Sequence, residues 1–389
     1  MTIRGKAHIA GAFEHPRREI PDRTLPQLHA EVATGALADA GLSFDDVDGF
    51  FTDSMAPGWS PITMAEYLGL DHLSYFDNTE SGGSSYLMHV GHAAAAIAAG
   101  KCNVALITLA GTPRSDRGRM RGGGNMGPDS PFEWLWGTTG PVSQYALVAQ
   151  RHMYEFGTTS EQLAWVKIAA SRHARHNPNA FLPDEVSVDE VLASRMISDP
   201  LHLLDCCVVT DGGGAIVVVS PDVASTLDRS TVSLLGHGEA PKHMHDGRID
   251  LSYTGGVWSG PRAFEEAGLT PDDIDYASIY DSFTITVVVT LEDLGFCEKG
   301  KGGPFVADGA LEAPHGRLPF NTDGGGLCNN HPGNRGGMTK IIEAVRQLRG
   351  EANAAVQVPD CEVAIVHGTG GSLGNRSGAA TLILGRADA

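Results

Sequence analysis

The chain has 389 residues, of which 42% are hydrophobic and 19% are charged. This length exceeds that of one typical domain core, so it predicts two domains or one fold built of two parts. The formal net charge of -19 argues against binding to nucleic acid, because a nucleic-acid-binding surface is basic. An anionic ligand would therefore have to meet a local basic site.

The six cysteines do not form any Cys-x-x-Cys pair, so their spacing disfavours a zinc site. The beginning of the chain lacks the hydrophobic core of a signal peptide, and no apolar run reaches the roughly 18 residues that a membrane span needs. We therefore expect no metal ion, no membrane contact and a reducing cytoplasm in which the thiols stay free.

One pattern occurs twice in the chain, at residues 36–48 and at residues 263–275. Each copy reads as the end of a helix, a capping glycine and a short acidic turn that leads into a strand. The strands are expected at residues 49–51 and 276–280.

A second pair of segments repeats in the same order. A helix predicted at residues 90–100 precedes a strand at 104–107, and a helix predicted at 339–350 precedes a strand at 363–366. Helices that alternate with buried strands are typical of βαβ units on a mostly parallel sheet. Two matched pairs in one order predict a duplicated α/β fold whose halves are related by a pseudo-twofold axis.

We place the first half of the fold at residues 1–225 and the second half at residues 226–389. An insertion of different character occupies about residues 112–200 of the first half. Its aromatic residues are Trp134, Trp136, Tyr145 and Trp165. The arginines at its start are Arg114, Arg117, Arg119 and Arg121. These arginines can belong to a solvated loop, or they can bind phosphate groups, which guanidinium groups hold in bidentate fashion.

A glycine-rich stretch at residues 321–338 contains His331 and Pro332 and runs into the last predicted helix. Glycines allow a backbone to approach a ligand closely, and a helix start offers unpaired N–H groups and the positive end of a dipole. Pro332 suits a first helical turn. We therefore predict that His331 is held in a rigid, electropositive pocket at the helix start. The alternative is a tight surface turn with an exposed histidine.

Three further clusters fall where a loop enters a helix or a strand ends: residues 81–85, 280–283 and 367–371. In open α/β sheets, ligand sites gather beyond the carboxyl ends of strands. In a duplicated fold, these clusters and the His331 loop can meet near the axis.

Together these features resemble the thiolase superfamily, specifically its sterol-carrier/lipid-transfer thiolase-like branch. The resemblance covers nearly the whole chain. It rests on the two halves, on the glycine-rich C-terminus and on residues 204–212, 280–283, 321–325 and 330–332. It implies a five-layer αβαβα thiolase fold with an inserted loop domain. It also implies an acyl-CoA substrate, with coenzyme A as part of that substrate and no permanently bound cofactor. The resemblance further implies a homodimer. It also implies a small zinc-ribbon/OB-fold partner protein, which is often found in this branch.

The sequence departs from the thiolases at the residues that carry their chemistry. Thiolases have a nucleophilic cysteine just before the first-half helix, and the matching position here is Gly83, with Ser84 and Ser85 beside it. Tyr280 replaces the histidine of the family's His-Asp-Cys-Phe motif. The second family cysteine, which handles the α-proton, falls where this chain has His367.

The histidine of the family's His-Pro motif is kept as His331. A tyrosine at position 280 without the nucleophile is similar to the steroid side-chain aldolases of the branch, which cleave β-hydroxyacyl-CoA thioesters by retro-aldol chemistry. Their second active-site tyrosine would align near His331. Thiolysis needs a nucleophile that becomes a covalent acyl carrier, and glycine cannot serve as one. Removing a proton and stabilising an enolate needs no covalent step.

The sequence therefore predicts an enzyme that breaks or forms a carbon–carbon bond in a CoA thioester, by retro-aldol cleavage of a β-hydroxyacyl-CoA, in lipid metabolism such as steroid degradation. In this hypothesis Tyr280 or His331 takes the hydroxyl proton. The amides near Gly83, or His331 itself, hold the enolate oxygen, and His367 or a water returns a proton. The predicted catalytic residues are His331, Tyr280, His367, Ser84 and Ser85. The residues predicted to hold coenzyme A are Gly83, Asn330, Gly370, Arg114 and Arg117.

Several of these residues also have a purely structural interpretation. Ser84 and Ser85 can cap the helix, Tyr280 can serve in packing, and His367 can bond to backbone. Two other functions stay open. One is acyl transfer or thiolysis of the acetyl-CoA acetyltransferase type, with a serine or a displaced cysteine as acyl carrier. The other is a catalytically inactive scaffold subunit that binds acyl-CoA or lipid.

Overall fold

The computed structural model describes residues 2–116, 130–138, 140–243, 249–333, 336–372 and 375–387. The strands are β1 (His8–Glu14), β2 (Gly49–Phe51), β3 (Tyr75–Asp77), β4 (Val104–Gly111), β5 (Met196–Ser198), β6 (Leu201–His202), β7 (Gly212–Val219), β8 (Val232–Lys242), β9 (Tyr276–Ile279), β10 (Val363–Ser372) and β11 (Asn375–Arg386). The helices are α1 (Leu25–Ala40), α2 (Pro61–Leu68), α3 (Ser85–Ala98), α4 (Ser130–Leu135), α5 (Pro141–Phe156), α6 (Ser160–Ala174), α7 (Val188–Ala193), α8 (Pro221–Ala224), α9 (Gly256–Ala267), α10 (Thr284–Asp293), α11 (Gly302–Val306) and α12 (Gly337–Arg349).

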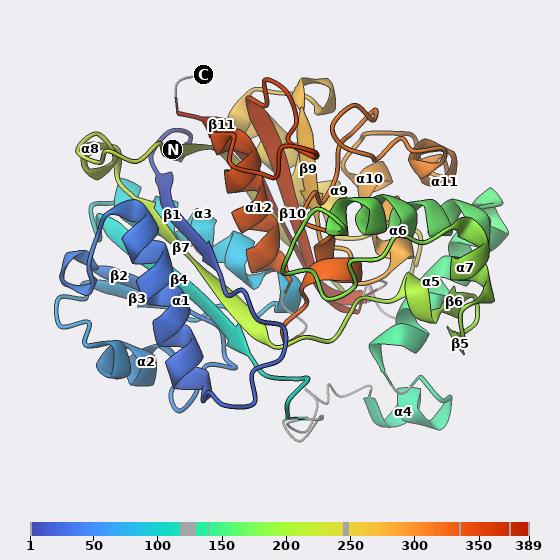
Figure 1. Cartoon of the computed structure of the whole chain (residues 1–389), viewed down its shortest axis with the longest axis horizontal. Helices are drawn as coiled ribbons and strands as arrows, with labels where there is room; N and C mark the ends of the chain where they lie inside the picture. The colour runs from blue at the N-terminus through green and yellow to red at the C-terminus, as the bar shows by residue number, and fades with distance from the viewer. Residues whose placement is uncertain are drawn as a thin grey trace.

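The large sheet has the strand order β3-β2-β4-β7-β1-β8-β11-β10-β9. It is continuous because β1 pairs with β7 of the first half and with β8 of the second half. Figure 1 shows the strands of the first half on the left and β9 and β10 on the right, with the insertion helices α5 and α6 beside the second half.

Three hydrophobic clusters define the layers. Helices α1 and α2 pack on one face of the first-half strands, and α9 and α10 pack with α5 and α6 on the second-half strands. Helices α3 and α12 share one core with strands of both halves. The first-half strands and the second-half strands of the continuous sheet therefore form two layers, with α3 and α12 between them and the other helices outside, which is the predicted αβαβα thiolase arrangement.

The predicted duplication is visible in the order of the elements. Helix α1, β2, α3 and β4 of the first half correspond to α9, β9, α12 and β10 of the second half. Helices α1 and α9 both end at a glycine with left-handed backbone, Gly41 (φ 72°) and Gly268 (φ 65°). Such a C-cap carries little steric penalty because glycine has no Cβ. The predicted boundary between residues 225 and 226 lies in the segment between α8 and β8.

The expectation of a mostly parallel sheet is wrong. Among the described strands of the large sheet, three ladders are parallel and five are antiparallel. Three of the antiparallel ladders arise because β10 and β11 form a hairpin and because β1 runs antiparallel between β7 and β8. The other two join β11 to β8 and β4 to β7. The alternation of helices and strands along the sequence does not encode these strand directions.

The predicted start of one helix is also wrong. Helix α3 begins at Ser85, five residues before its predicted start.

No helix among the described residues is long and apolar enough to cross a membrane. The same part of the chain contains no group of three or more histidine, cysteine, aspartate or glutamate residues that could hold a metal ion.

Five buried histidines and the largely buried His237 predict a loss of stability in mild acid. Burial lowers the pKa of five of them to about 4, namely His29, His89, His173, His237 and His331, and that of His367 to about 3. An unfolded chain protonates its histidines near pH 6.5, so it binds more protons than the folded chain as the pH falls from about 6.5 towards 4. The free energy of unfolding must then decrease over this range. We expect the midpoint of urea unfolding to fall steadily between about pH 6.5 and pH 5.

The variant His29→Gln provides the control for this prediction. The Nδ1 atom of His29 lies 3.0 Å from Thr108 Oγ1, a contact that a glutamine can approximate. The variant should lose stability less steeply between pH 6.5 and pH 5 than the unmodified protein, whatever its stability at pH 7. An unfolding midpoint that stays constant over this range in the unmodified protein would contradict the prediction.

Candidate active site

Tyr280 and His331 form a hydrogen-bonded pair. Tyr280 follows β9 directly, and its Oη atom lies 2.7 Å from Nε2 of His331. The two rings are tilted, with centroids 5.5 Å apart. Both residues are almost completely buried, at 4% exposure each. A phenol and an imidazole, which are groups that can exchange a proton, are therefore held together away from bulk water.

His331 lies in a loop and not at the start of a helix, so that prediction is wrong. Helix α12 begins only at Gly337, and Pro332 forms an isolated bridge with Thr210 of the first half. The backbone N–H of His331 donates a hydrogen bond to Thr210 Oγ1 at 2.8 Å. The imidazole is thus oriented by a contact between the two halves. The alternative of an exposed surface histidine is excluded by its burial.

The glycine turn of the first half lies directly against Tyr280. Gly83 belongs to a 3₁₀ turn, η2 (Gly82–Ser84), that precedes α3. A Cβ atom added to Gly83 would lie 2.7 Å from Tyr280 Cζ and 2.4 Å from the carbonyl oxygen of Thr369. The structure therefore brings the turn at the position of the family nucleophile together with Tyr280 and His331.

The hydroxyl groups of Ser84 and Ser85 are used within this turn. Ser84 Oγ donates a hydrogen bond to the carbonyl oxygen of Ser81 at 3.0 Å, and Ser85 Oγ accepts one from the Ser81 N–H at 2.9 Å. Both serines are fully buried. Ser84 is the N-cap residue of α3, but its side chain makes no capping hydrogen bond, so the predicted cap is absent there. The contacts with Ser81 hold the turn together, and among the described residues neither hydroxyl contacts a base that would activate it.

His367 is not brought to the pair. Its Nδ1 atom lies 2.9 Å from Thr381 Oγ1 on β11, and a Cβ atom on Gly256 of α9 would lie 3.5 Å from its Cε1. Its backbone carbonyl, however, accepts a hydrogen bond from the Tyr280 N–H at 2.9 Å. The ring is fully buried on the α9 side of the strand, because successive side chains of a strand point to opposite faces.

Two of the residues predicted to hold coenzyme A have structural contacts. The side-chain amide of Asn330 accepts a hydrogen bond from Thr210 Oγ1 and donates one to Glu14 Oε1, both at 2.8 Å. Gly370 allows β10 to pass the first-half turn, because a Cβ atom there would lie 1.6 Å from the carbonyl oxygen of Ser81. Both residues therefore join the two halves beside the site.

Arg114 lies at the start of the insertion. Its guanidinium group stacks over the ring of Phe181 at 4.4 Å and its Nε atom lies 3.5 Å from a carboxylate oxygen of Glu19. The side chain is about one-third exposed, so it could exchange this weak ion pair for a phosphate group. Arg117, the other arginine predicted to contact coenzyme A, lies outside the described residues.

Sequence reasoning assigned no role to Cys207, whose Sγ atom lies 3.6 Å from Nδ1 of His331. The sequence held only an indirect signal, because this cysteine belongs to the segment 204–212 that carries the family resemblance. For Tyr145, the sequence indicated only that it is one of the aromatic residues of the insertion. Its ring packs 4.4 Å from the ring of Phe283, so helix α5 of the insertion contributes a wall next to the site.

A buried ion pair supports the loop that carries His331. Nζ of Lys340 lies 3.1 Å from Oδ1 of Asp281, and both side chains are fully buried. Asp281 also accepts hydrogen bonds from the N–H groups of Gly326 and Leu327. The pair therefore ties the end of β9 to the glycine-rich stretch and to α12.

Burial is the main reason why the pKa of His331 falls to about 4. Asp281 acts against this shift, and Lys340 adds to it. The imidazole is consequently neutral at physiological pH and has one nitrogen free to accept a proton.

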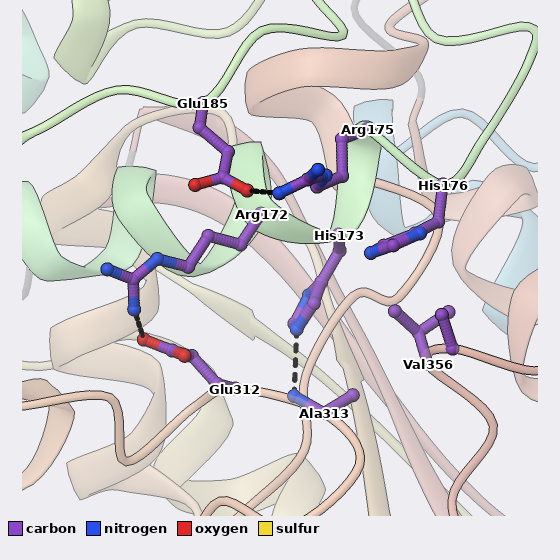
Figure 2. A pocket seen from close by; sticks show the side chains of 9 residues that line it. Arg172, His173, Arg175, His176, Glu185, Glu312, Ala313 and Val356 are labelled. Carbon is purple, nitrogen blue, oxygen red and sulfur yellow. Dashed lines mark hydrogen bonds and ion pairs between the residues drawn. The ribbon is translucent and has the colours of Figure 1, made fainter.

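A separate pocket of about 340 Å³ lies on the insertion side, and Figure 2 shows the side chains that line it. Arg172 is paired with Glu312 and Arg175 with Glu185 across it. Each arginine is therefore neutralised by a carboxylate, so this pocket is a weak candidate for binding an anion. Tyr280 and His331 are not among its lining residues.

Comparisons with known proteins agree with the fold and the motifs. The family model "Thiolase C-terminal domain-like" matches residues 238–386. The chain is 36% identical over 370 residues to a 17-hydroxy-3-oxo-4-pregnene-20-carboxyl-CoA lyase of Mycobacterium tuberculosis, covering 90% of this chain and 92% of the relative. It is 33% identical over 375 residues to an acetyl-CoA acetyltransferase of Methanothermobacter thermautotrophicus, and this match covers 94% of this chain and 96% of the relative.

A solved structure of an Ltp2-ChsH2(DUF35) aldolase is similar over 99% of this chain and 98% of that chain, with a TM-score of 0.88 and 34% identity. The chain therefore belongs to the thiolase superfamily, in the sterol-carrier/lipid-transfer thiolase-like branch that the sequence motifs predicted.

Proposed function

We propose that the protein is a CoA-thioester carbon–carbon lyase that cleaves a β-hydroxyacyl-CoA by a retro-aldol reaction. The observation that carries this proposal is the 2.7 Å contact between Tyr280 Oη and His331 Nε2, directly beside Gly83. In this proposal a pair that can transfer a proton lies beside Gly83, the residue at the position where a thiolase has its nucleophile. The similarity to a carboxyl-CoA lyase and to an aldolase over nearly the whole chain supports the same reaction class.

The pair can move the required proton without an ionised residue at the start. Tyr280 Oη accepts the proton of the substrate's β-hydroxyl while its own proton passes to Nε2 of the neutral His331. The bond between the α- and β-carbons then breaks. The β-oxygen becomes the carbonyl of the departing ketone or aldehyde, and the electron pair passes to the thioester as an enolate. The proton on His331 returns through Tyr280 to the α-carbon, so the reaction consumes no net proton.

The first-half turn is the proposed site of the enolate oxygen. Gly83 is the residue of this turn that touches the Tyr280 ring, and α3 begins two residues later. N–H groups at a helix start favour negative charge, and each donor aimed at such an oxygen contributes on the order of 10²–10³-fold to the rate. In this assignment Ser84 and Ser85 shape the turn, and coenzyme A enters as part of the substrate.

We further propose a homodimer and a small zinc-ribbon/OB-fold partner. The resemblance of the motifs supports both, and the similarity to a structure of an Ltp2-ChsH2(DUF35) aldolase supports a partner protein. The cysteines are all free in the structure, which agrees with a reducing cytoplasm as the site of action.

The test is an assay of the purified protein, alone and together with a candidate zinc-ribbon/OB-fold partner, on short and bulky β-hydroxyacyl-CoAs, including one with a steroid side chain. We expect release of a ketone or aldehyde together with the shortened acyl-CoA. Intact-protein mass spectrometry after the reaction should detect no acyl adduct. A stable adduct on Ser84, Ser85 or Cys328 would instead support the acetyl-CoA acetyltransferase reaction, and a lack of turnover with every substrate would support a scaffold subunit.

A further inference from the structure

The imidazole of His331 has a side-chain partner at each ring nitrogen. Its Nε2 atom lies 2.7 Å from Tyr280 Oη, and its Nδ1 atom lies 3.6 Å from Cys207 Sγ. The second distance is within the range of a hydrogen bond to sulfur. The phenol and the thiol therefore occupy opposite sides of one ring.

Cys207 is held in place by the same loops that hold His331. Its backbone N–H donates a hydrogen bond to the carbonyl oxygen of Ser282 at 2.9 Å, and the next residue, Val208, donates one to the carbonyl oxygen of Gly326 at 2.9 Å. Three residues after Cys207, Thr210 accepts the hydrogen bond from the His331 backbone. The segment from Cys207 to Thr210 thus runs alongside the His331 loop.

A neutral imidazole carries one N–H, and a thiol can either accept a hydrogen bond from an Nδ1–H or donate one to a bare Nδ1, so the tautomer of the ring decides the direction of both contacts. With the hydrogen on Nδ1, the ring donates to the sulfur and Nε2 presents a lone pair to Tyr280. With the hydrogen on Nε2, the ring cannot take the proton of Tyr280, and the proposed reaction stops at its first step. Burial raises the pKa of the Cys207 thiol far above its ordinary value, so the sulfur meets the ring as a neutral thiol.

We infer that Cys207 is a positioning residue, which holds His331 in the tautomer protonated at Nδ1 so that Nε2 is the basic nitrogen facing Tyr280. This inference rests on the proposed function, because it states how the base of that reaction is set. The sulfur forms no covalent bond. When Nε2 takes the proton of Tyr280, the Nδ1–H continues to donate to Sγ of Cys207.

The chain offers a matched control in the neighbouring thiol. Cys206 Sγ donates to the carbonyl oxygen of His202 at 3.3 Å, and Cys206 has no contact with His331 among the described residues. Cys207→Ala removes the proposed acceptor, Cys207→Ser replaces the sulfur by an oxygen that can accept the same hydrogen bond, and Cys206→Ala removes a thiol one residue away.

The test has two readouts, and the first does not depend on turnover. In protein labelled with ¹⁵N-histidine, the ring nitrogens of His331, assigned by comparison with His331→Gln, should show the hydrogen on Nδ1. In Cys207→Ala the signals should shift towards those of the tautomer with the hydrogen on Nε2. In Cys207→Ser and Cys206→Ala the hydrogen should stay on Nδ1. A hydrogen on Nε2 in the unmodified protein, or an unchanged tautomer in Cys207→Ala, would overturn the inference.

The second readout is kcat/KM with the substrate found for the proposed function. Loss of one hydrogen bond that sets a tautomer should lower kcat/KM about 10-fold in Cys207→Ala, and Cys207→Ser should recover most of the loss. An acyl adduct on Cys207 would overturn the positioning role, because the sulfur would then be a nucleophile. If the tautomer responds as expected but no β-hydroxyacyl-CoA is cleaved, the positioning role stands and the proposed function fails.

Discussion

Replacing Tyr280 by phenylalanine is expected to lower kcat/KM for the β-hydroxyacyl-CoA by about 10²–10⁴-fold, the usual contribution of a positioned acid or base. The substitution removes Oη and with it the 2.7 Å contact with His331 Nε2. The ring, which packs against Gly83 and Gly336, stays in place. The loss should therefore appear in turnover, measured as release of the shortened acyl-CoA, with little change in the urea unfolding midpoint.

The control is Tyr154→Phe, which removes the same hydroxyl from a side chain that is exposed to solvent. It should leave kcat/KM unchanged. His331→Gln should be about as inactive as Tyr280→Phe, and the double variant should be little worse than either, because residues that act as one unit have non-additive effects. A Tyr280→Phe variant with nearly full activity would show that the phenol takes no part in the proton transfer.

The second large effect is expected at Gly83. In Gly83→Ala, the new Cβ atom would lie 2.4 Å from the carbonyl oxygen of Thr369 and 2.7 Å from Tyr280 Cζ. The carbonyl belongs to the β10 backbone and cannot rotate away, so the Tyr280 ring or the turn must move. Displacing a reacting group by about 1 Å can cost about 10²-fold in rate, and overpacking a filled site costs typically about 1–3 kcal/mol of stability. We expect both losses, measured by kcat/KM and by urea unfolding.

Gly140→Ala is the matched control for this change. A Cβ atom at position 140 meets no atom of the described residues within 4 Å, and the backbone of Gly140 is extended with φ -176°, so both activity and stability should be retained. A Gly83→Ala variant with full activity and stability would mean that Tyr280 does not lie against the turn. The same overlap predicts that Gly83→Cys, which restores the family nucleophile, does not create a thiolase while Tyr280 is present.

The sequence by itself determined the features that depend on neighbouring residues and on family motifs. Local signals predicted the duplicated fold. These signals are the capping glycines Gly41 and Gly268 and the acidic turns that follow them. The reaction class was indicated by three positions: Gly83 where the family has a cysteine, Tyr280 where it has a histidine, and His331, which matches the histidine of the family's His-Pro motif. Each of these features depends only on residue type and spacing along the chain. Backbone preferences at a cap or turn are set by neighbouring residues, and the chemistry of a motif is set by which residue types it contains.

The tertiary structure alone decided which of the candidate side chains meet. His367 and Tyr280 are joined through their backbones, yet the His367 ring lies in the core beside α9, because side chains alternate along β10. Cys207 and His331 are far apart in sequence but become neighbours where a segment of the first half runs alongside a loop of the second. The directions of β1 and β11, and the bridge that holds Pro332 outside α12, also come from this packing. Contacts between distant segments depend on how whole layers pack, and no local pattern of residues specifies them.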